Sequence, residues 1–295
     1  MKAIDLHLHS DFSEDGDFPV GEVFSLARDA GLAALSITDH DSVESIAPAL
    51  AASIQYGIEC APGIELTTVL PLDGSQQHIL GYFIDGDSVS LKRLLEEIRG
   101  FRASIAQRRM DALRRIGFAI DEKRVREMVG GRAPAATSII CEALDNPENA
   151  GDPRLSEYHG GAKGENRVMH FYAQFFLEGR PAFVPFESVD TESGVRAIRQ
   201  AGGVAVLAHP IFLKNRDWLD TIRDYGIRGI EAVSSYHGEA DTEFFLSYAR
   251  KHGLLVTAGS DFHGPTTKPR VRIGGISGND YALYEALREE KERGR

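Results

Sequence analysis

The sequence predicts an α/β fold built around a parallel sheet that is either open or closed into a barrel. Short apolar runs alternate with helical stretches up to about residue 86, and this alternation resumes after residue 184. Repeated strand–helix units of this kind form parallel sheets. The rhythm breaks over residues 88–183, which predicts an inserted, mostly helical domain. A chain of 295 residues is long enough for one large domain with such an insertion.

One pair of expected strands differs from the rest. Residues 58–68 and 77–84 are joined through Pro71-Leu72-Asp73-Gly74, which is too short for a helical crossover. This pair therefore predicts a hairpin or a local excursion. The other expected strands lie over residues 3–8, 32–38, 204–208, 229–234 and 254–259, and the expected helices over residues 20–30, 191–201, 216–225 and 240–252.

The middle segment is distinct in pattern and in charge. A long helical pattern leads into a loop rich in Gly, Asn, Pro and Asp over residues 145–166, followed by an aromatic helix, HFYAQFFLEG. Residues 92–132 carry 12 Lys or Arg against 6 Asp or Glu, a net charge of +6, which leaves −17 for the remainder of a chain of net charge −11. A solvated helix with ion pairs explains most of these side chains. A sharper alternative is that a few of them bind an anion.

Composition excludes several classes of protein. The net charge of −11 argues against a protein that coats nucleic acid, because such proteins carry a basic surface. No apolar signal core and no membrane span are found, so we expect a soluble, cytoplasmic protein. Cys60 and Cys141 are the only cysteines and lack a metal-binding spacing, so we expect both to be reduced and structural.

Histidines and carboxylates gather where the expected strands end. Asp5, His7 and His9 share one face of the first strand, because side chains alternate along a strand. A His-x-His pair alone is more often structural than metal-binding. Active sites of parallel α/β folds, however, lie at the carboxyl ends of strands. Of ten histidines, six lie at or beside such ends, namely His7, His9, His40, His78, His209 and His263.

These histidines are accompanied by Asp15, Glu65 and Asp261 at matching places. So many imidazoles and carboxylates in one core would suffer heavy desolvation unless cations offset it. The pattern therefore predicts a site for more than one metal ion. Imidazole and carboxylate without thiolate suit Mn²⁺, Fe or Zn. Nine ligands exceed the needs of one ion, so two or three ions are expected, with a carboxylate bridge. Asp11 and Glu14 are expected to be solvated loop residues.

Together these residues resemble the PHP (polymerase and histidinol phosphatase) family. The motifs that carry the resemblance are His7-x-His9, Asp15-Gly16, Thr38-Asp39-His40, Gly63-Ile64-Glu65, His78, Ala208-His209-Pro210 and Ser260-Asp261-Phe262-His263. The resemblance implies a distorted seven-stranded βα barrel of amidohydrolase type over residues 1–87 and 184–295, with residues 88–183 as a helical cap domain. It also implies three divalent ions, with Mn²⁺ as the first choice and Fe or Zn as alternatives.

The resemblance also assigns ligands to each ion. Carried over position by position, the first ion takes His7, His9, Glu65 and Asp261; the second takes Glu65 as the bridge, His78 and His209; and the third takes Asp15, His40 and His263. A water held between two such ions is acidified and can attack a phosphorus atom bound by the same ions.

Substrate contacts are expected from His237 and from the inserted segment. His237, after the strand GIEAVS, is the candidate phosphate ligand or proton donor. Arg132 is the first choice for a second phosphate, because it follows Gly130-Gly131 and the resemblance places an Arg there. Arg154 and Lys163 are weaker candidates, and Tyr158 or a Phe of the insertion is considered for stacking on a base. The insertion is similar to that of the small stand-alone PHP phosphoesterases, but the chain departs from this subgroup after Arg132, where Ala-Pro-Ala-Ala replaces a Pro-His pair.

The expected function is that of a metal-dependent phosphoric monoester hydrolase. The substrate is a small phosphorylated nucleotide, and the preferred reaction removes the 3′-phosphate of a nucleoside 3′,5′-bisphosphate. A 5′→3′ exonuclease acting on short RNA would use the same metals, and a histidinol phosphatase would need an acidic pocket where the insertion is basic. A non-catalytic accessory module is the rival from another class, although all nine ligand positions are filled. No membrane and no protein partner are expected.

Overall fold

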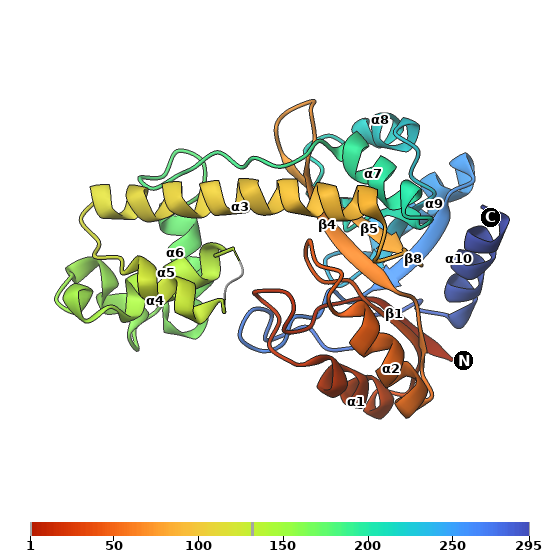
Figure 1. The fold of residues 1–295 in the computed structure, drawn as a ribbon, viewed down its shortest axis with the longest axis horizontal. Coiled ribbons are helices and arrows are strands. Elements are labelled where there is room, and N and C mark those ends of the chain that lie inside the picture. The colour runs from red at the N-terminus through yellow and green to blue at the C-terminus, as the bar shows by residue number, and fades with distance from the viewer. Residues whose placement is uncertain (1, 131–132, 295) are drawn as a thin grey trace. The chain divides into compact units, whose positions relative to one another are not determined.

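The structure is a computed structural model that describes residues 2–130 and 133–294 (Figure 1). Contacts between residues divide the chain into two compact units. The first unit runs up to Glu97 and resumes at Val189, and the second lies between these residues. Helix α3 (Val89–Arg115) begins in the first unit and ends in the second. The domain boundaries expected near residues 88 and 183 stay predictions.

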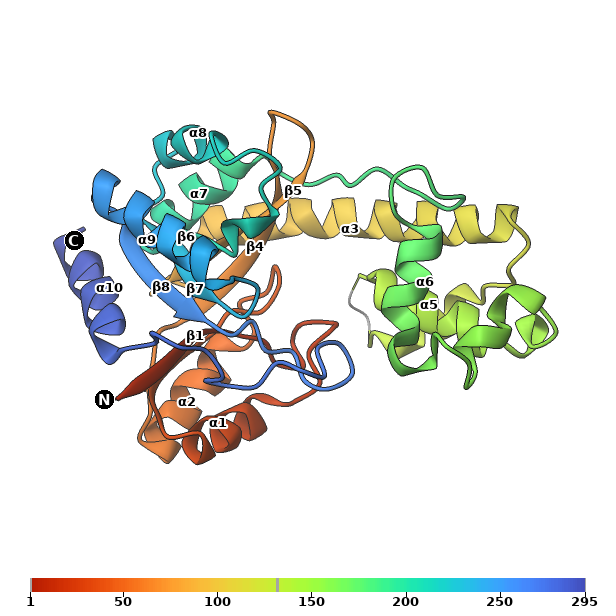
Figure 2. The same cartoon turned by 180° about the vertical axis from the view of Figure 1, so that it is seen from behind.

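The strands of the first unit form two sheets, which can be followed in Figures 1 and 2. The smaller sheet is parallel and has the order β1-β2-β3, and the larger has the order β4-β5-β6-β7-β8. In the larger sheet β5 runs antiparallel to both of its neighbours, whereas β6, β7 and β8 are parallel. The strands are β1 (Ala3–Leu8), β2 (Leu32–Ile37), β3 (Glu59–Cys60), β4 (Gly63–Val69), β5 (Gln76–Tyr82), β6 (Val204–Leu207), β7 (Gly229–Ser234) and β8 (Leu255–Gly259).

The two sheets meet where their strands end. An isolated parallel bridge joins Leu8 to Phe262, and another joins His40 to Glu65. Strand β1 also contacts β8. The predicted hairpin is present as β4 and β5, and it makes the larger sheet mixed rather than wholly parallel. The described strands therefore form two sheets and not a clear seven-stranded barrel.

The strand expected over residues 58–68 is split in two. The break falls at Ala61 and Pro62, where the proline has no N–H to donate to a sheet. Gly63 then starts β4, and a Cβ atom at this position would lie 2.3 Å from Oγ of Ser36. Glycine thus lets the chain pass directly from the smaller sheet to the larger one.

Helices of the first unit cover the sheets (Figures 1 and 2). Helix α1 packs on α2 and β2, α7 contacts β4, β5 and β6, α9 contacts β7, and α10 contacts β8. Asp190 caps α7 by accepting a hydrogen bond from Ser193 N. The helices are α1 (Val20–Asp29), α2 (Ile46–Tyr56), α7 (Thr191–Gln200), α8 (Trp218–Asp224), α9 (Glu239–His252), α10 (Tyr281–Arg293) and the 3₁₀ turn η4 (Pro210–Phe212).

The described residues of the second unit form helices and no strand. Phe118, Phe171 and Phe175 pack together in its core. Tyr158 is 2% exposed in the same core, so the idea that it stacks on a base is wrong. The elements are the end of α3, α4 (Glu122–Met128), α5 (Ala136–Asp145), α6 (Arg167–Phe175) and, in the predicted loop, the 3₁₀ turns η1 (Pro147–Asn149), η2 (Pro153–Tyr158) and η3 (Gly164–Asn166).

Several basic side chains of residues 92–132 form ion pairs, as a solvated helix predicts. Nη1 of Arg108 lies 2.8 Å from Oε1 of Glu187, and Nη1 of Arg114 lies 3.0 Å from Oδ1 of Asp111. The guanidinium of Arg109 instead packs over the ring of Phe176. For these arginines, local contacts explain the basic charge without an anionic ligand.

Within the described ranges, no helix combines the length and the apolar character needed to cross a membrane.

Candidate metal centre

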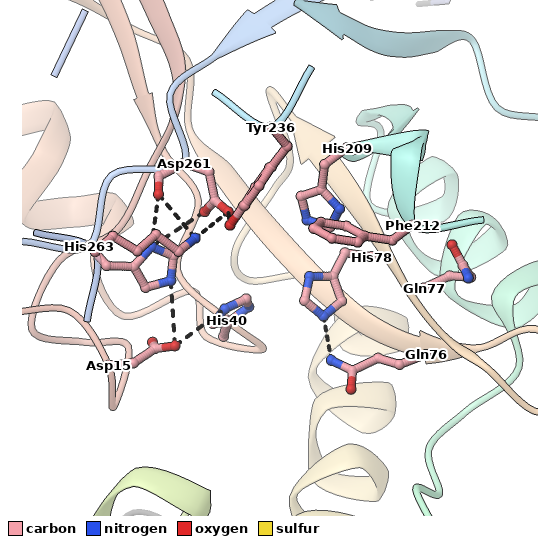
Figure 3. A pocket seen from close by; sticks show the side chains of 11 residues that line it. Asp15, His40, Gln76, Gln77, His78, His209, Phe212, Tyr236, Asp261 and His263 are labelled. Carbon is pink, nitrogen blue, oxygen red and sulfur yellow. Dashed lines mark hydrogen bonds and ion pairs between the residues drawn. The ribbon is translucent and has the colours of Figure 1, made fainter. Parts of the chain in front are cut away.

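All nine predicted ligands lie in the first unit, where the two sheets meet. Figure 3 shows six of them, namely Asp15, His40, His78, His209, Asp261 and His263. Strands β1, β4 and β5 contribute residues from within the strand, and the other residues follow β1, β2, β6 or β8. Six of the nine side chains are buried, and the other three are half-buried. The residues are His7, His9, Asp15, His40, Glu65, His78, His209, Asp261 and His263.

The most buried part of the cluster contains two imidazoles and two carboxylates. Nε2 of His7 lies 3.1 Å from Oε2 of Glu65 and 3.3 Å from Oδ1 of Asp261. Nε2 of His9 lies 3.1 Å and 3.2 Å from the same two oxygens. None of these four atoms has a hydrogen-bond partner, although all are buried. Four ligand atoms placed about 2.0–2.2 Å from one ion lie at comparable distances from one another.

Glu65 connects this group to a second one. Its Oε1 lies 2.7 Å from Nδ1 of His78 and 3.1 Å from Nε2 of His209. Its other oxygen, Oε2, lies 3.1 Å from Nδ1 of His40. Both carboxylate oxygens therefore face imidazole nitrogens, which is the arrangement that a bridging carboxylate requires.

A third group lies around Asp15. Its Oδ2 is 3.4 Å from Nε2 of His263 and 3.8 Å from Nε2 of His40. The ring of His263 stacks on that of His9, with 3.9 Å between the ring centroids. Ligand atoms of His9, His40 and His263 lie within 4.8 Å of one another. His9 and His40 thus border more than one group.

Two residues of the cluster have left-handed backbone conformations. His209 has a φ of 22° and Asp261 a φ of 55°. They are the second residues after β6 and β8, respectively. Such conformations cost on the order of 1–3 kcal/mol for residues other than glycine. Strain of this kind concentrates at functional sites, where it positions side chains that the strand geometry would direct elsewhere.

Glu231, which the sequence did not single out, orients two of the histidines. It is fully buried in β7; its Oε1 lies 2.9 Å from Nδ1 of His7, and its Oε2 accepts a 2.8 Å hydrogen bond from His209 N. Gly259 makes room for this pair, since a Cβ there would lie 2.2 Å from Cβ of His7. With Nδ1 donating to Glu231, the Nε2 lone pair of His7 faces the cluster. The sequence offered one indication of this role, because Glu231 is the single charged residue within the strand GIEAVS.

Ser13 orients the ring of His9 in a similar way, through a contact with its Nδ1. Nδ1 of His9 lies 3.0 Å from Oγ of Ser13, which donates a 2.8 Å hydrogen bond to Oδ1 of Asp39. The same oxygen accepts a hydrogen bond from Ser10 N. Asp39 therefore supports the site from behind, although it contacts none of the nine predicted ligands in these bonds. Asp5, on the face shared with His7 and His9, likewise accepts backbone N–H groups.

Burial and charge shift the pKa values of the cluster in opposite directions. Burial favours the neutral form of Glu65, but the charges of His7 and His78 outweigh it and hold the pKa of Glu65 well below its usual range. Burial also opposes protonation of His9, yet the nearby carboxylates of Asp261 and Glu65 favour the charged ring and raise its pKa to about 9. A metal ion that binds His9 at neutral pH must therefore displace a proton.

A cavity of about 290 Å³ opens onto the cluster (Figure 3). Five of its lining residues were not predicted: Gln76, Gln77, Phe212, Tyr236 and Lys268. The hydroxyl of Tyr236 donates a 2.7 Å hydrogen bond to Oδ2 of Asp261, and Nζ of Lys268 contacts the same oxygen. These contacts leave Oδ1 of Asp261 facing the histidines. Among the described lining residues, Lys268 is the one Lys or Arg.

Of the predicted substrate residues, His237 belongs to the first unit. His237 is not among the lining residues; its Nδ1 donates to the carbonyl of Ala232, 2.9 Å away, and its ring packs on Phe245. The adjacent Tyr236 makes the cavity contact instead. Glu14, expected to be solvated, has both carboxylate oxygens buried, whereas Asp11 is exposed.

Arg154 and Lys163 have local partners within the second unit. Arg154 forms hydrogen bonds with both carboxylate oxygens of Asp152 and lies 3.9 Å above the ring of Phe118. Lys163 pairs with Glu157 at 3.0 Å. These local contacts explain the positions of both side chains, so no bound substrate is needed to explain them. Arg132 lies outside the described residues, and its role stays a prediction.

Comparison with known proteins identifies the family. A model of the PHP domain matches residues 5–126. Over 272 residues the chain is 30% identical to the 3′,5′-nucleoside bisphosphate phosphatase of Chromobacterium violaceum, a match that covers 90% of this chain and 88% of that protein. The chain belongs to the PHP family. The resemblance inferred from the strand-end motifs is thereby confirmed.

Other PHP relatives differ in their named activity. The phosphoribosyl 1,2-cyclic phosphate 1,2-diphosphodiesterase of Eggerthella lenta is 29% identical over 262 residues, which cover 88% of this chain and 94% of that protein. The 5′-3′ exoribonuclease of Haemophilus influenzae is 25% identical over 277 residues, or 90% and 91% of the two chains. These names have hydrolysis of phosphate esters in common and confirm the expected enzyme class, whereas the substrates differ.

A solved structure agrees with the fold. An amidohydrolase from Chromobacterium violaceum, with bound sulfate and no metal, superposes with a TM-score of 0.80 at 26% identity. The superposition covers 98% of this chain and 96% of that chain. The amidohydrolase-like α/β fold implied by the motifs is therefore confirmed.

Proposed function

We propose that this PHP protein removes the 3′-phosphate from a nucleoside 3′,5′-bisphosphate and releases a 5′-nucleotide and phosphate. The observation that carries the proposal is the convergence of nine His, Asp and Glu side chains, six of which line one cavity, with buried ligand atoms that lack hydrogen-bond partners. The relative that is 30% identical over most of both chains is named for this activity.

The residues fit a group of divalent ions. Nε2 of His7, Nε2 of His9 and Oδ1 of Asp261 are buried without hydrogen-bond partners, a costly arrangement unless a cation binds there. Mn²⁺ is our first choice, and Fe and Zn suit the same imidazole and carboxylate ligands. We assign the first ion to His7, His9, Glu65 and Asp261; the second to Glu65, His78 and His209; and the third to Asp15, His40 and His263.

Bound divalent ions would supply positive charge for phosphoryl oxygens and lower the pKa of a water. The chain itself contributes orientation and charge. Glu231 and Ser13 set the tautomers of His7 and His9 so that Nε2 of each ring faces the cluster. Lys268 adds a cation to the cavity wall, where it can offset the charge of an incoming phosphate. These groups are in place before substrate binds, which is the basis of electrostatic preorganisation.

Exoribonuclease activity on short RNA is the second candidate, and the Haemophilus influenzae relative favours it. The two reactions differ in the bond that is cleaved. A bisphosphate phosphatase cleaves a phosphomonoester, whereas an exoribonuclease cleaves the phosphodiester that joins two nucleotides. Comparing hydrolysis of a phosphomonoester with hydrolysis of a phosphodiester therefore distinguishes the two activities, although both would use the same metal centre.

The test measures phosphate release by the Mn²⁺-loaded protein from a panel of substrates, together with nucleotide release from the RNA. The panel contains adenosine 3′,5′-bisphosphate, adenosine 5′-monophosphate, histidinol phosphate and a short 5′-phosphorylated RNA. We expect the bisphosphate to give the highest kcat/KM. Preferential degradation of the RNA would replace the proposal with the second candidate, and no hydrolysis of any substrate would overturn it.

Variants connect the activity to the cluster. His9→Ala is expected to abolish turnover, because it removes a ligand atom shared by two of the buried groups. His252→Ala is the matched control, since His252 lies at the end of α9 with its ring against Tyr248. Activity that survives His9→Ala at the level of the control would exclude this cluster as the active site.

A further inference from the structure

Phe212 is an exposed apolar residue at the edge of a polar cavity. It lines the cavity, yet 54% of its surface is accessible to solvent. Exposed apolar residues that occur singly are ordinary. This ring, however, borders the proposed metal centre, and its surroundings hold it in a defined place.

The position of Phe212 is set by its neighbours in the chain and in space. It ends the 3₁₀ turn η4, which begins directly after His209, and its N–H lies 3.3 Å from the carbonyl of His209. Its ring makes T-shaped contacts with His209, at 5.2 Å between centroids, and with Tyr236, at 4.9 Å. Both contacted side chains also line the cavity, as Figure 3 shows.

The size of the cavity indicates what would contact this ring. Pockets that enclose a small ligand usually measure about 300–1,000 Å³, and this one is at the lower limit, at about 290 Å³. Its polar lining suits a phosphoryl group close to the proposed ions. The remainder of a nucleotide would then extend toward the rim, where Phe212 presents a flat apolar surface.

We propose that Phe212 is a specificity-determining residue that stacks on the base of the nucleotide substrate. The inference rests on the proposed function and extends it, because it names the part of the substrate that this chain recognises beside the phosphate. Aromatic stacking accepts any base, since every base has a π face. Phe212 would thus select nucleotides over sugar phosphates without selecting one base.

The experiment compares two bisphosphates that differ only in the base. Adenosine 3′,5′-bisphosphate and 1-deoxyribose 3,5-bisphosphate are hydrolysed by the wild-type protein and by Phe212→Leu, which remains apolar but has no flat ring. A stacked base contributes binding equivalent to between about 5-fold and about 150-fold in affinity. We expect KM for the nucleotide to rise within this range, with kcat nearly unchanged and KM for the base-free compound unaffected.

Two further variants separate stacking from support of the site. Phe212→Tyr keeps the ring and is expected to retain the wild-type KM. Phe244→Leu is the matched control, because Phe244 is also exposed, at 37%, but does not line the cavity. Equal loss for both substrates, or loss of bound metal, would show that Phe212 only supports His209, and unchanged kinetics would exclude a contact with the base. Either result would overturn the inference.

A binding measurement keeps the inference distinct from the proposed function. Calorimetry on the full chain compares adenosine 5′-monophosphate with inorganic phosphate in the wild type and in Phe212→Leu. We expect weaker binding of the nucleotide alone. Should the wild type hydrolyse neither bisphosphate, the proposed function would fail while this comparison still decided the role of Phe212. Equal binding of the nucleotide by both proteins would overturn the inference on its own.

Discussion

Replacing Glu231 by glutamine changes one atom of a buried carboxylate and is expected to weaken metal binding. Glu231 serves two donors, His7 Nδ1 at 2.9 Å and His209 N at 2.8 Å. A glutamine amide has one oxygen to accept and an NH₂ that can only donate. One of the two donors therefore loses its acceptor in Glu231→Gln.

The expected loss of metal affinity can be estimated from the cost of leaving one of these donors without an acceptor. A buried donor without a partner costs about 1–3 kcal/mol. His7 can avoid this cost by moving its proton to Nε2, but Nε2 is the atom that faces Glu65 and Asp261. Either route opposes binding of an ion at this position. Loss of such an outer partner lowers metal affinity by about 10- to 100-fold in other sites, and we expect a loss in this range.

Calorimetric titration of the metal-free protein with Mn²⁺ measures the effect, and circular dichroism reports whether the variant remains folded. Glu290→Gln is the matched control, because Glu290 pairs with Arg228 at 2.6 Å and does not line the metal-site cavity. A folded Glu231→Gln protein that binds Mn²⁺ within twofold of the wild type would refute the orienting role of Glu231.

Three further predictions rest on the structure, and a fourth, on Arg132, rests on the sequence. The pKa of His9 is raised from 6.5 to about 9, so its stabilising contribution to the metal-free protein is complete below pH 6.5 and is lost as the pH rises through 9. Mn²⁺ affinity should rise over the same pH range, because the metal no longer competes with a proton. Thermal melts and Mn²⁺ titrations that do not change with pH would contradict this prediction. Lys268→Met should lower affinity for inorganic phosphate by about 10-fold or more, measured by calorimetry, since charged hydrogen bonds contribute about 1.5–3 kcal/mol. Phe171→Ala should destabilise the second unit by about 3–5 kcal/mol in denaturant unfolding, because the side chain is fully buried, while leaving the Mn²⁺ stoichiometry unchanged. Arg132→Ala should raise KM for the bisphosphate more than for a 5′-monophosphate, and equal changes would argue against a contact with the second phosphate.

Several features could be predicted from the sequence because they depend on local pattern. Period-two and helical spacing placed most strands of the first unit within one or two residues of their observed bounds. The ends of these strands located most of the candidate ligands, since parallel strands bring their carboxyl ends to a common edge, whereas Glu65 lies within β4 and Asp15 in the loop after β1. His7 and Asp261 are more than 250 residues apart in the chain, yet each was found from its own strand.

Other features required the packed structure. The division into two sheets at Pro62 and the antiparallel β5 depend on which strands pair, and pairing is a non-local choice. Tyr236 was overlooked in favour of His237 because neighbouring residues of a loop differ in direction, which no periodicity fixes there. Lys268 and Phe212 belong to loops whose paths are set by contacts elsewhere, such as the hydrogen bond from Thr266 N to Asp17.

The sequence by itself thus determined the chemistry of this protein: which side chains can bind metal, and at which end of the strands they stand. The tertiary structure decided how these side chains are used. It directs both oxygens of Glu65 toward imidazoles, sets Glu231 behind His7, and leaves Phe212 at the rim of the cavity. The reason is physical: residue type and spacing are properties of the chain, whereas orientation and exposure arise only when distant segments pack together.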